Sequence, residues 1–160
     1  MIIKKIIKND NGQTEFNKYE FDMFFIDNIN EKKSDEDTYI IVEQQSEFED
    51  AFNAINYVNK YPGLITTVLS DLYDIFNKSG VWKYKYIEEN NMEELKKQLL
   101  NIKSNNIFLS FYCNKYHSLY EYSNIIEEIK INENDNSLIR FGLPYVDDEN
   151  KNIRLHVFYQ

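Results

Sequence analysis

Cysteine, proline, glycine and histidine are scarce in this chain of 160 residues, which contains one cysteine, two prolines, four glycines and two histidines. The single cysteine, Cys113, excludes an intramolecular disulfide. Its position in the apolar run Ile107–Cys113 predicts a buried, inert thiol in a reducing compartment. The glycines are far apart in the sequence (Gly12, Gly63, Gly80 and Gly142), so they form no glycine-rich phosphate loop.

Long apolar runs and an excess of basic residues are also lacking. No run approaches the length of about 18 residues that suggests a membrane-spanning helix, and no signal peptide is recognisable, so we expect a cytoplasmic protein. The formal net charge of −9 argues against binding to nucleic acid or to an anionic membrane. The same charge suits a basic protein partner, and it equally serves solubility.

Aromatic residues, in contrast, are abundant, with 13 tyrosines and 11 phenylalanines. Together with 42% hydrophobic residues, they predict a globular fold rather than disorder, despite 28% charged residues. The N-terminal segments Met1–Lys8 and Thr14–Ile26 flank Asn11-Gly12, a strong signal for a β-hairpin. We expect an N-terminal hairpin and charged connector over residues 1–37 and one domain over residues 38–160.

The remaining segments alternate between strand and helix patterns. Helices are predicted from Ser46 with Glu49, from Leu64, from Asn91, and from Ser118 with Glu121; the first and last pairs are capping boxes. Gly80 is expected to end the second helix as a left-handed cap. Strands are predicted at Thr38–Val42, Val81–Ile87 and Ile107–Cys113, and a closing hairpin at Leu138–Val146 and Ile153–Tyr159. This order predicts an α+β fold, a mixed β-sheet packed against helices on one face.

Several short sequences resemble the FtsZ family, the bacterial tubulin-like GTPases. The family pattern P-G-L-I-N-x-D-F-x-D-V is similar to the segment from Pro62 to Leu72, which follows the end of the family's central helix. Further similar segments, in the family's order, are Asn106–Phe111, Ser118–Glu121, Ile125–Ile129, Ile139–Leu143 and Ile153–Val157. The resemblance covers about residues 48–160. It implies a tubulin/FtsZ C-terminal-domain-like fold without the family's GTP-binding domain.

The departures from the family pattern bear on function. In FtsZ filaments, the loop after the central helix inserts polar residues into the nucleotide site of the next subunit. Here the family's asparagine is replaced by Thr66 and its first aspartate by Val68, and the second aspartate remains as Asp71. Valine can neither accept a proton nor orient water, and loss of such a group typically costs about 10²–10⁴ in rate. We therefore expect no enzymatic activity and no cofactor.

The resemblance also implies an interface. Its candidate residues are Gly63, Leu64, Thr66, Thr67 and Asp71, although Asp71 is equally compatible with an ordinary surface position on a helix.

Three other sequence patterns could suggest catalysis, metal binding or nucleic-acid binding, but each has a simpler structural explanation. His117 and His156 are more consistent with surface histidines than with a metal or catalytic pair. Asp147-Asp148-Glu149 lacks the spacing of a calcium loop and is typical of a turn. Trp82, Tyr84 and Tyr86 alternate with lysines, as in single-strand nucleic-acid binders, but the acidic chain favours a packed aromatic face. No metal site is predicted.

These observations favour a non-enzymatic protein that acts by protein–protein contact. The resemblance implies a cap, regulator or co-assembly partner of a cytoskeletal GTPase filament in cell division, possible partners being FtsZ-type GTPases. An alternative is an acidic small inhibitor, an immunity protein or antitoxin, although the acids are scattered along the chain rather than gathered. An enzyme with a hidden site is the least favoured, and an aromatic ligand pocket without chemistry remains open.

Overall fold

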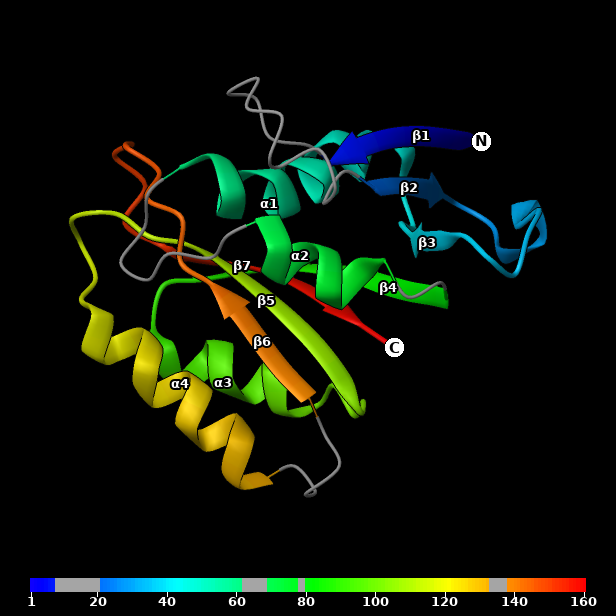
Figure 1. Cartoon of the computed structure of the whole chain (residues 1–160). Coiled ribbons are helices and arrows are strands. Elements are labelled where there is room, and N and C mark those ends of the chain that lie inside the picture. Colours follow the sequence, from blue (N-terminus) through cyan, green and yellow to red (C-terminus); the bar gives the residue numbers. More distant parts are fainter. Residues whose placement is uncertain (8–20, 62–68, 78–79, 133–137) are drawn as a thin grey trace.

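The computed structural model describes residues 1–7, 21–61, 69–77, 80–132 and 138–160. These residues form a seven-stranded mixed sheet in the order β1-β2-β3-β4-β7-β5-β6 (Figure 1). The strands are β1 (Ile2–Ile7), β2 (Phe21–Ile26), β3 (Thr38–Ile41), β4 (Gly80–Glu89), β5 (Asn106–Tyr112), β6 (Leu138–Gly142) and β7 (Ile153–Tyr159). The α-helices are α1 (Phe48–Lys60), α2 (Leu69–Phe76), α3 (Met92–Leu100) and α4 (Leu119–Asn132). The predicted α+β class with a mixed sheet is confirmed.

The N-terminal strand pair is present as predicted. β1 and β2 pair antiparallel, with Ile2 opposite Ile26, while the predicted turn at Asn11-Gly12 lies outside the described residues. β2 then pairs parallel with β3, and β3 pairs parallel with β4. The sheet is therefore continuous across residues 37 and 38, and the division of the chain into two parts there stays a prediction.

The predicted closing hairpin is wrong. β7 lies between β4 and β5 and pairs antiparallel with both, whereas β6 pairs parallel with the other side of β5. The cause is visible in the burial of the two strands. Residues 153–158 are all buried, which requires a central strand, whereas β6 alternates between exposed and half-buried residues, as an edge strand does.

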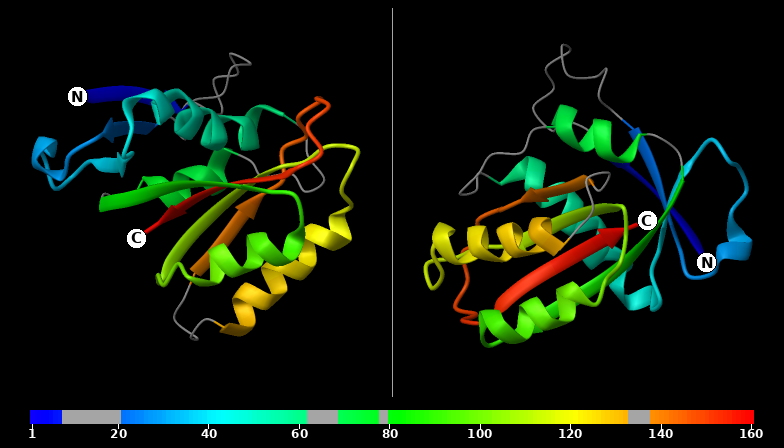
Figure 2. Two further views of the ribbon diagram at one scale, coloured as in Figure 1. Left: turned by 180° about the vertical axis from the view of Figure 1, so that it is seen from behind. Right: turned by 90° about the horizontal axis from the view of Figure 1, so that it is seen from below.

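Helices cover both faces of the sheet, not one face as predicted (Figure 2). On one face, α1 and α2 pack on a core cluster that includes Phe48, Phe76 and Phe158. On the other face, α3 and α4 pack on a second cluster that includes Leu99 and Tyr122. Because alternate residues of a strand point to opposite faces, the central strands contribute to both clusters.

Two of the predicted helix ends differ in the structure. α1 begins at Phe48 after a 3₁₀ turn at Gln45–Glu47, and no side chain caps it. The carboxylate of Glu49 instead accepts a hydrogen bond from Lys5 at 2.5 Å, so Ser46 and Glu49 form no capping box. α2 ends at Phe76, and Gly80 opens β4 with φ +133°, so it is not the cap of that helix.

The other two caps are confirmed. The side chain of Asn91 accepts a hydrogen bond from the backbone N–H of Glu94 at 2.9 Å at the start of α3. Before α4, the backbone N–H of Ser118 donates to the Glu121 carboxylate at 2.6 Å, and the N–H of Glu121 donates to the Ser118 hydroxyl at 3.4 Å. This reciprocal pair is a capping box.

Candidate functional site

The predicted interface lies where the chain passes from α1 to α2. Gly63, Leu64, Thr66 and Thr67 lie outside the described residues, as does Val68. Asp71 lies in the first turn of α2 and is half-buried. The interface therefore stays a prediction, and α2 is the part of it whose surroundings can be described.

Buried aromatic packing fixes α2 on the sheet. The side chains of Leu72 and Phe76 are fully buried. The ring of Phe76 lies 5.0 Å from Trp82, 5.3 Å from Phe108 and 5.9 Å from Phe158, measured between centroids. Edge-to-face and tilted aromatic pairs at these distances stabilise a core beyond simple burial. Leu72 and Phe76 thus anchor the helix on the core, while Asp74 on its other side is exposed.

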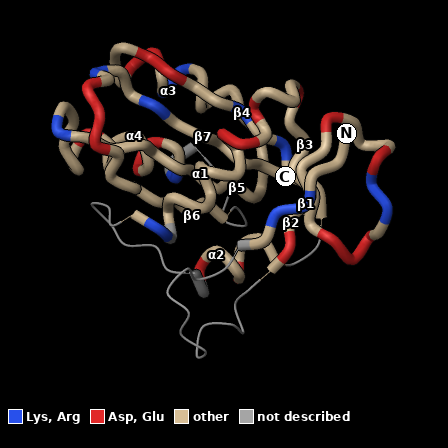
Figure 3. The backbone as a smooth tube through the Cα atoms, turned by 90° about the horizontal axis from the view of Figure 1, so that it is seen from above, with Lys and Arg blue, Asp and Glu red and all other residues tan. Residues whose placement is uncertain are grey.

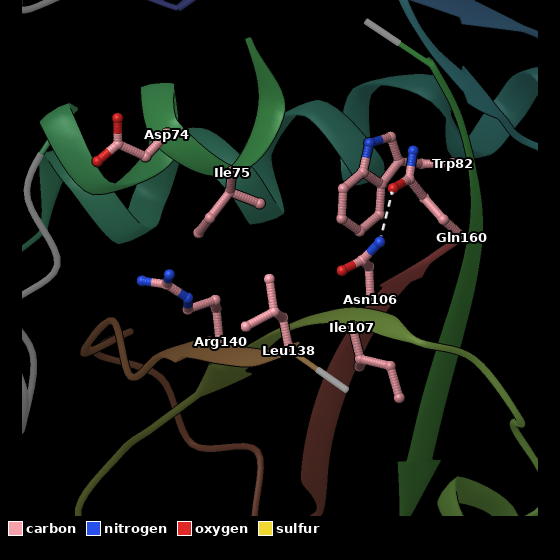
Figure 4. Close-up of a pocket in the computed structure, with 8 residues that line it drawn as sticks. All are labelled: Asp74, Ile75, Trp82, Asn106, Ile107, Leu138, Arg140 and Gln160. Carbon is pink, nitrogen blue, oxygen red and sulfur yellow. Dashed lines mark hydrogen bonds between the residues drawn. The ribbon is translucent and has the colours of Figure 1, made fainter. Parts of the chain in front are cut away.

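A cleft of about 100 Å³ lies between α2 and the sheet (Figure 4). Asp74 and Ile75 of α2 form one wall, and Leu138 and Arg140 of the edge strand β6 form the opposite wall. The remaining lining residues come from the ends of the central strands and are Trp82, Asn106, Ile107 and Gln160. Elements far apart in the sequence therefore meet at this cleft.

The two charged side chains of the cleft have opposite signs. Neither Asp74 nor Arg140 forms a hydrogen bond or ion pair with any residue that the structure describes, and both are exposed. The amide of Asn106 donates a hydrogen bond to the side-chain oxygen of Gln160 at 3.1 Å. The cleft thus has a carboxylate, a guanidinium group and apolar side chains in one lining.

A second polar cluster, which the sequence analysis missed, lies on the α1 side of the sheet. His156 is buried, not at the surface as predicted, and its Nδ1 lies 2.8 Å from the Tyr84 hydroxyl. The ring centroids of Tyr112 and Tyr86 lie 4.4 and 4.8 Å from the centroid of the His156 ring. Burial, with the nearby Arg154 charge, lowers the pKa of His156 to about 3. The strand period contained the signal, since His156 shares a face with Phe158.

Arg154 and Asp148 connect this cluster to the loop before β7. The guanidinium group donates to the two Asp148 oxygens at 2.6 and 3.0 Å, and the Asn114 amide donates to the same carboxylate at 3.2 Å. Burial alone would raise the pKa of the Asp148 carboxyl, but the hydrogen bonds from Arg154 and Asn114 lower it. The acidic segment at 147–149 therefore organises a loop.

The remaining candidate groups are held in separate places. His117 contacts the Lys151 carbonyl oxygen at 2.8 Å, whereas His156 pairs with Tyr84, so the histidines belong to different hydrogen-bond networks. Cys113 is buried as predicted, and burial raises the pKa of its thiol to about 12. Within the described ranges, no three His, Cys, Asp or Glu side chains gather as metal ligands. Nor is any helix there long and apolar enough to cross a membrane.

The chain has the architecture of a mixed sheet with helices on both faces, and this architecture also occurs in FtsZ. A mutant of FtsZ from M. jannaschii is similar with a TM-score of 0.58 and 16% identity, over 78% of this chain and 46% of that one. An empty dimer of FtsZ from M. jannaschii is similar with a TM-score of 0.58 and 14% identity, over 77% of this chain and 45% of that one. The chain therefore has an FtsZ-like fold, as the sequence resemblance predicted.

The similarity has clear bounds. The chain spans less than half the length of these FtsZ structures, which is consistent with a unit like the C-terminal domain. No protein-family model matches the sequence, and no curated protein matches it.

Proposed function

We propose that this chain acts by protein–protein contact with a filament of an FtsZ-type GTPase, as a cap, a regulator or a co-assembly partner. The observation that carries this proposal is the packing of α2 on the sheet of an FtsZ-like fold, through the buried side chains of Leu72 and Phe76. Asp71 follows the predicted interface loop on this helix. Asp74, one turn later, lines a cleft opposite Arg140, which has no ion-pair partner among the described residues. One of the similar structures is an FtsZ dimer, which shows that FtsZ itself can associate with a second copy.

The proposed contact is non-enzymatic. The 160 residues contain no glycine-rich phosphate loop, and Val68 stands where the family pattern has an aspartate. A subunit that docks by one face and cannot supply the next nucleotide site would limit filament growth. A stable contact requires about 1,000 Å² or more of total buried surface, so α2 and the loop before it would act together with β6.

The acidic-inhibitor alternative rests on net charge alone. An inhibitor of a basic target needs carboxylates that converge on one face. Figure 3 shows the Asp and Glu residues spread over several elements, including α3 and the segment between β2 and β3. We therefore favour the filament partner.

The test is a sedimentation assay with the purified chain, the FtsZ-type GTPase of the same organism, and GTP. We expect a dose-dependent change in pelleted polymer and in phosphate release. Asp71→Lys and Asp74→Lys should each weaken this effect by reversing a charge on α2. Glu127→Lys is the matched control, because Glu127 is an exposed acid of α4 on the opposite face of the sheet.

Two outcomes would count against the proposal. The first is normal polymerisation of the GTPase with no co-pelleting of this chain at any ratio. The second is an effect that the α2 variants and Glu127→Lys reduce equally, because this would move the contact away from α2.

A further inference from the structure

Lys83 stands in a row of apolar side chains that crosses the sheet. In the strand register, Ile41 of β3 lies beside Lys83 on one side and Tyr159 of β7 on the other. The row continues to Ile26 of β2 and to Ile107 of β5. Directly paired residues of neighbouring strands point to the same face of the sheet. Lys83 is thus a single charge in an otherwise uncharged row.

This row forms part of the floor of an open groove on the α3 and α4 side of the sheet. Figure 2 shows that the start of β4 extends beyond these two helices, toward the segment between β2 and β3. The groove has a volume of about 480 Å³ and is lined mainly by apolar atoms. Its lining residues are Ile29, Ile41, Val81, Lys83, Lys103, Tyr159 and Gln160. This volume lies within the range of about 300–1,000 Å³ that is usual for small-molecule sites.

The two lysines of the groove have no acidic partner in the part of the chain that the structure describes. Lys83 and Lys103 are both exposed, and neither forms a hydrogen bond or ion pair within the described ranges. The groove therefore contains two lysine side chains and no carboxylate among its lining residues. Lys96 and Lys97 of α3, in contrast, each pair with at least one glutamate. Two ammonium groups beside apolar surface suit a ligand with an anionic head and an apolar body.

We propose that this groove binds a small apolar carboxylic acid, with an aliphatic or aromatic body. The body lies on Ile41, Val81 and Tyr159, and the carboxylate lies at the ammonium groups of Lys83 and Lys103. A polyanion fits less well, because repulsion by the net charge of −9 increases with the charge of the ligand and is smallest for a single carboxylate. The groove lies on the α3 and α4 side of the sheet and shares Gln160 with the cleft beside α2, but its test does not depend on the filament contact proposed above.

The experiment titrates the full chain with decanoate below its micelle concentration, by calorimetry and by NMR of the Ile and Val methyl groups. We expect saturable one-to-one binding that shifts the Ile41 and Val81 signals. Decanol, which keeps the apolar body and lacks the charge, should bind at least about tenfold more weakly. The double variant Lys83→Met/Lys103→Met, which keeps much of the apolar stem, should lower decanoate affinity by about tenfold or more.

The matched control is Lys85→Met, a lysine two residues further along β4 that points to the same face and does not line the groove. It should bind decanoate as the unaltered chain does. Val81→Asp is a second variant, in which a carboxylate in the floor repels the ligand. Thermal unfolding checks that each variant is folded. The absence of saturable decanoate binding would overturn the proposal, as would equal affinities for decanoate and decanol or unchanged affinity in both the double variant and Val81→Asp.

Discussion

The hydroxyl group of Tyr84 lies 2.8 Å from Nδ1 of His156, and both side chains are buried on the α1 side of the sheet. No partner within the described residues contacts the other ring nitrogen, Nε2. The imidazole therefore depends on a single hydrogen bond. Because burial lowers the pKa of His156 to about 3, this ring is neutral at pH 7.

The losses of stability caused by removing each member of this pair should not be additive. Tyr84→Phe leaves Nδ1 of His156 unpaired, and His156→Phe leaves the Tyr84 hydroxyl unpaired. Each single change should lower the free energy of unfolding by about 1–3 kcal/mol, the cost of an unsatisfied buried polar group. The double variant should lose less than the sum. Urea unfolding of the four proteins gives the coupling free energy; strictly additive losses would contradict a direct hydrogen bond.

His156 should also make stability depend on pH. Its pKa is about 3 in the folded chain and near the usual 6.5 when unfolded, so between these values the unfolded state binds the proton. The free energy of unfolding should therefore fall as the pH drops below about 6.5, with a slope from this group of at most about 1.4 kcal/mol per pH unit. Unfolding measured between pH 7 and pH 5 tests this. The Tyr84→Phe/His156→Phe variant should show a shallower dependence.

The Arg154–Asp148 pair should stabilise the loop before β7. Arg154 is only 8% exposed, so Asp148→Ala leaves a nearly buried guanidinium group without its carboxylate. We expect a loss on the order of 2–3 kcal/mol in the free energy of unfolding. Lys115→Ala is the comparison, because its pair with Glu149 lies at the surface and should leave the unfolding midpoint nearly unchanged. Equal effects of the two changes would contradict a special role for the buried pair.

Gly142 should not tolerate a side chain. A Cβ atom there would overlap the methyl groups of Val58, because α1 packs directly on β6 at this point. Gly142→Ala should therefore lower the free energy of unfolding by about 1–3 kcal/mol, as overpacking does. Adding Val58→Ala removes the overlapping methyl groups, so the double variant should lose less than the sum of the single changes. Thermal or urea unfolding of the three variants measures this.

Two helix starts offer a matched comparison. Asn91→Ala removes the hydrogen bond to the Glu94 N–H and should lower the free energy of unfolding by about 1 kcal/mol. Ser46→Ala should have little effect, because no side chain caps α1. Chemical unfolding of both variants provides the measurement. If Ser46→Ala lowered the free energy of unfolding as much as Asn91→Ala, this would support the capping box that the sequence pattern predicts and contradict the structure.

Local patterns predicted most elements, and pairing between elements was harder to predict. The Asn91 cap and the Ser118 capping box depend on residues within one turn, so the sequence contains all the necessary information. The parallel pairing of β6 with β5 depends instead on which strand is buried on both sides, a property of the whole sheet. The side chain of Glu49 also depends on a distant residue, because its carboxylate accepts a hydrogen bond from Lys5, 44 residues earlier in the chain.

The candidate sites also contain residues that a local pattern identifies and residues that only the folded structure brings together. Asp71 could be named from a local resemblance, but the opposition of Asp74 and Arg140 requires α2 and β6 to meet in space. Lys83 looked like one lysine of an alternating strand, Val81–Ile87. Its apolar neighbours come from β3 and β7, which are far from it in sequence. No spacing rule within one segment detects a groove built from such cross-strand neighbours.

The position of β7 has a consequence for biosynthesis. β7 joins β4 to β5 and so links the two parts of the sheet, yet it is the last of the seven strands to leave the ribosome. The nascent chain can form the pairs β1–β2, β2–β3, β3–β4 and β5–β6, but these remain two separate sheets until residues 153–159 emerge. The emerging pieces keep two strand edges open for mispairing during translation.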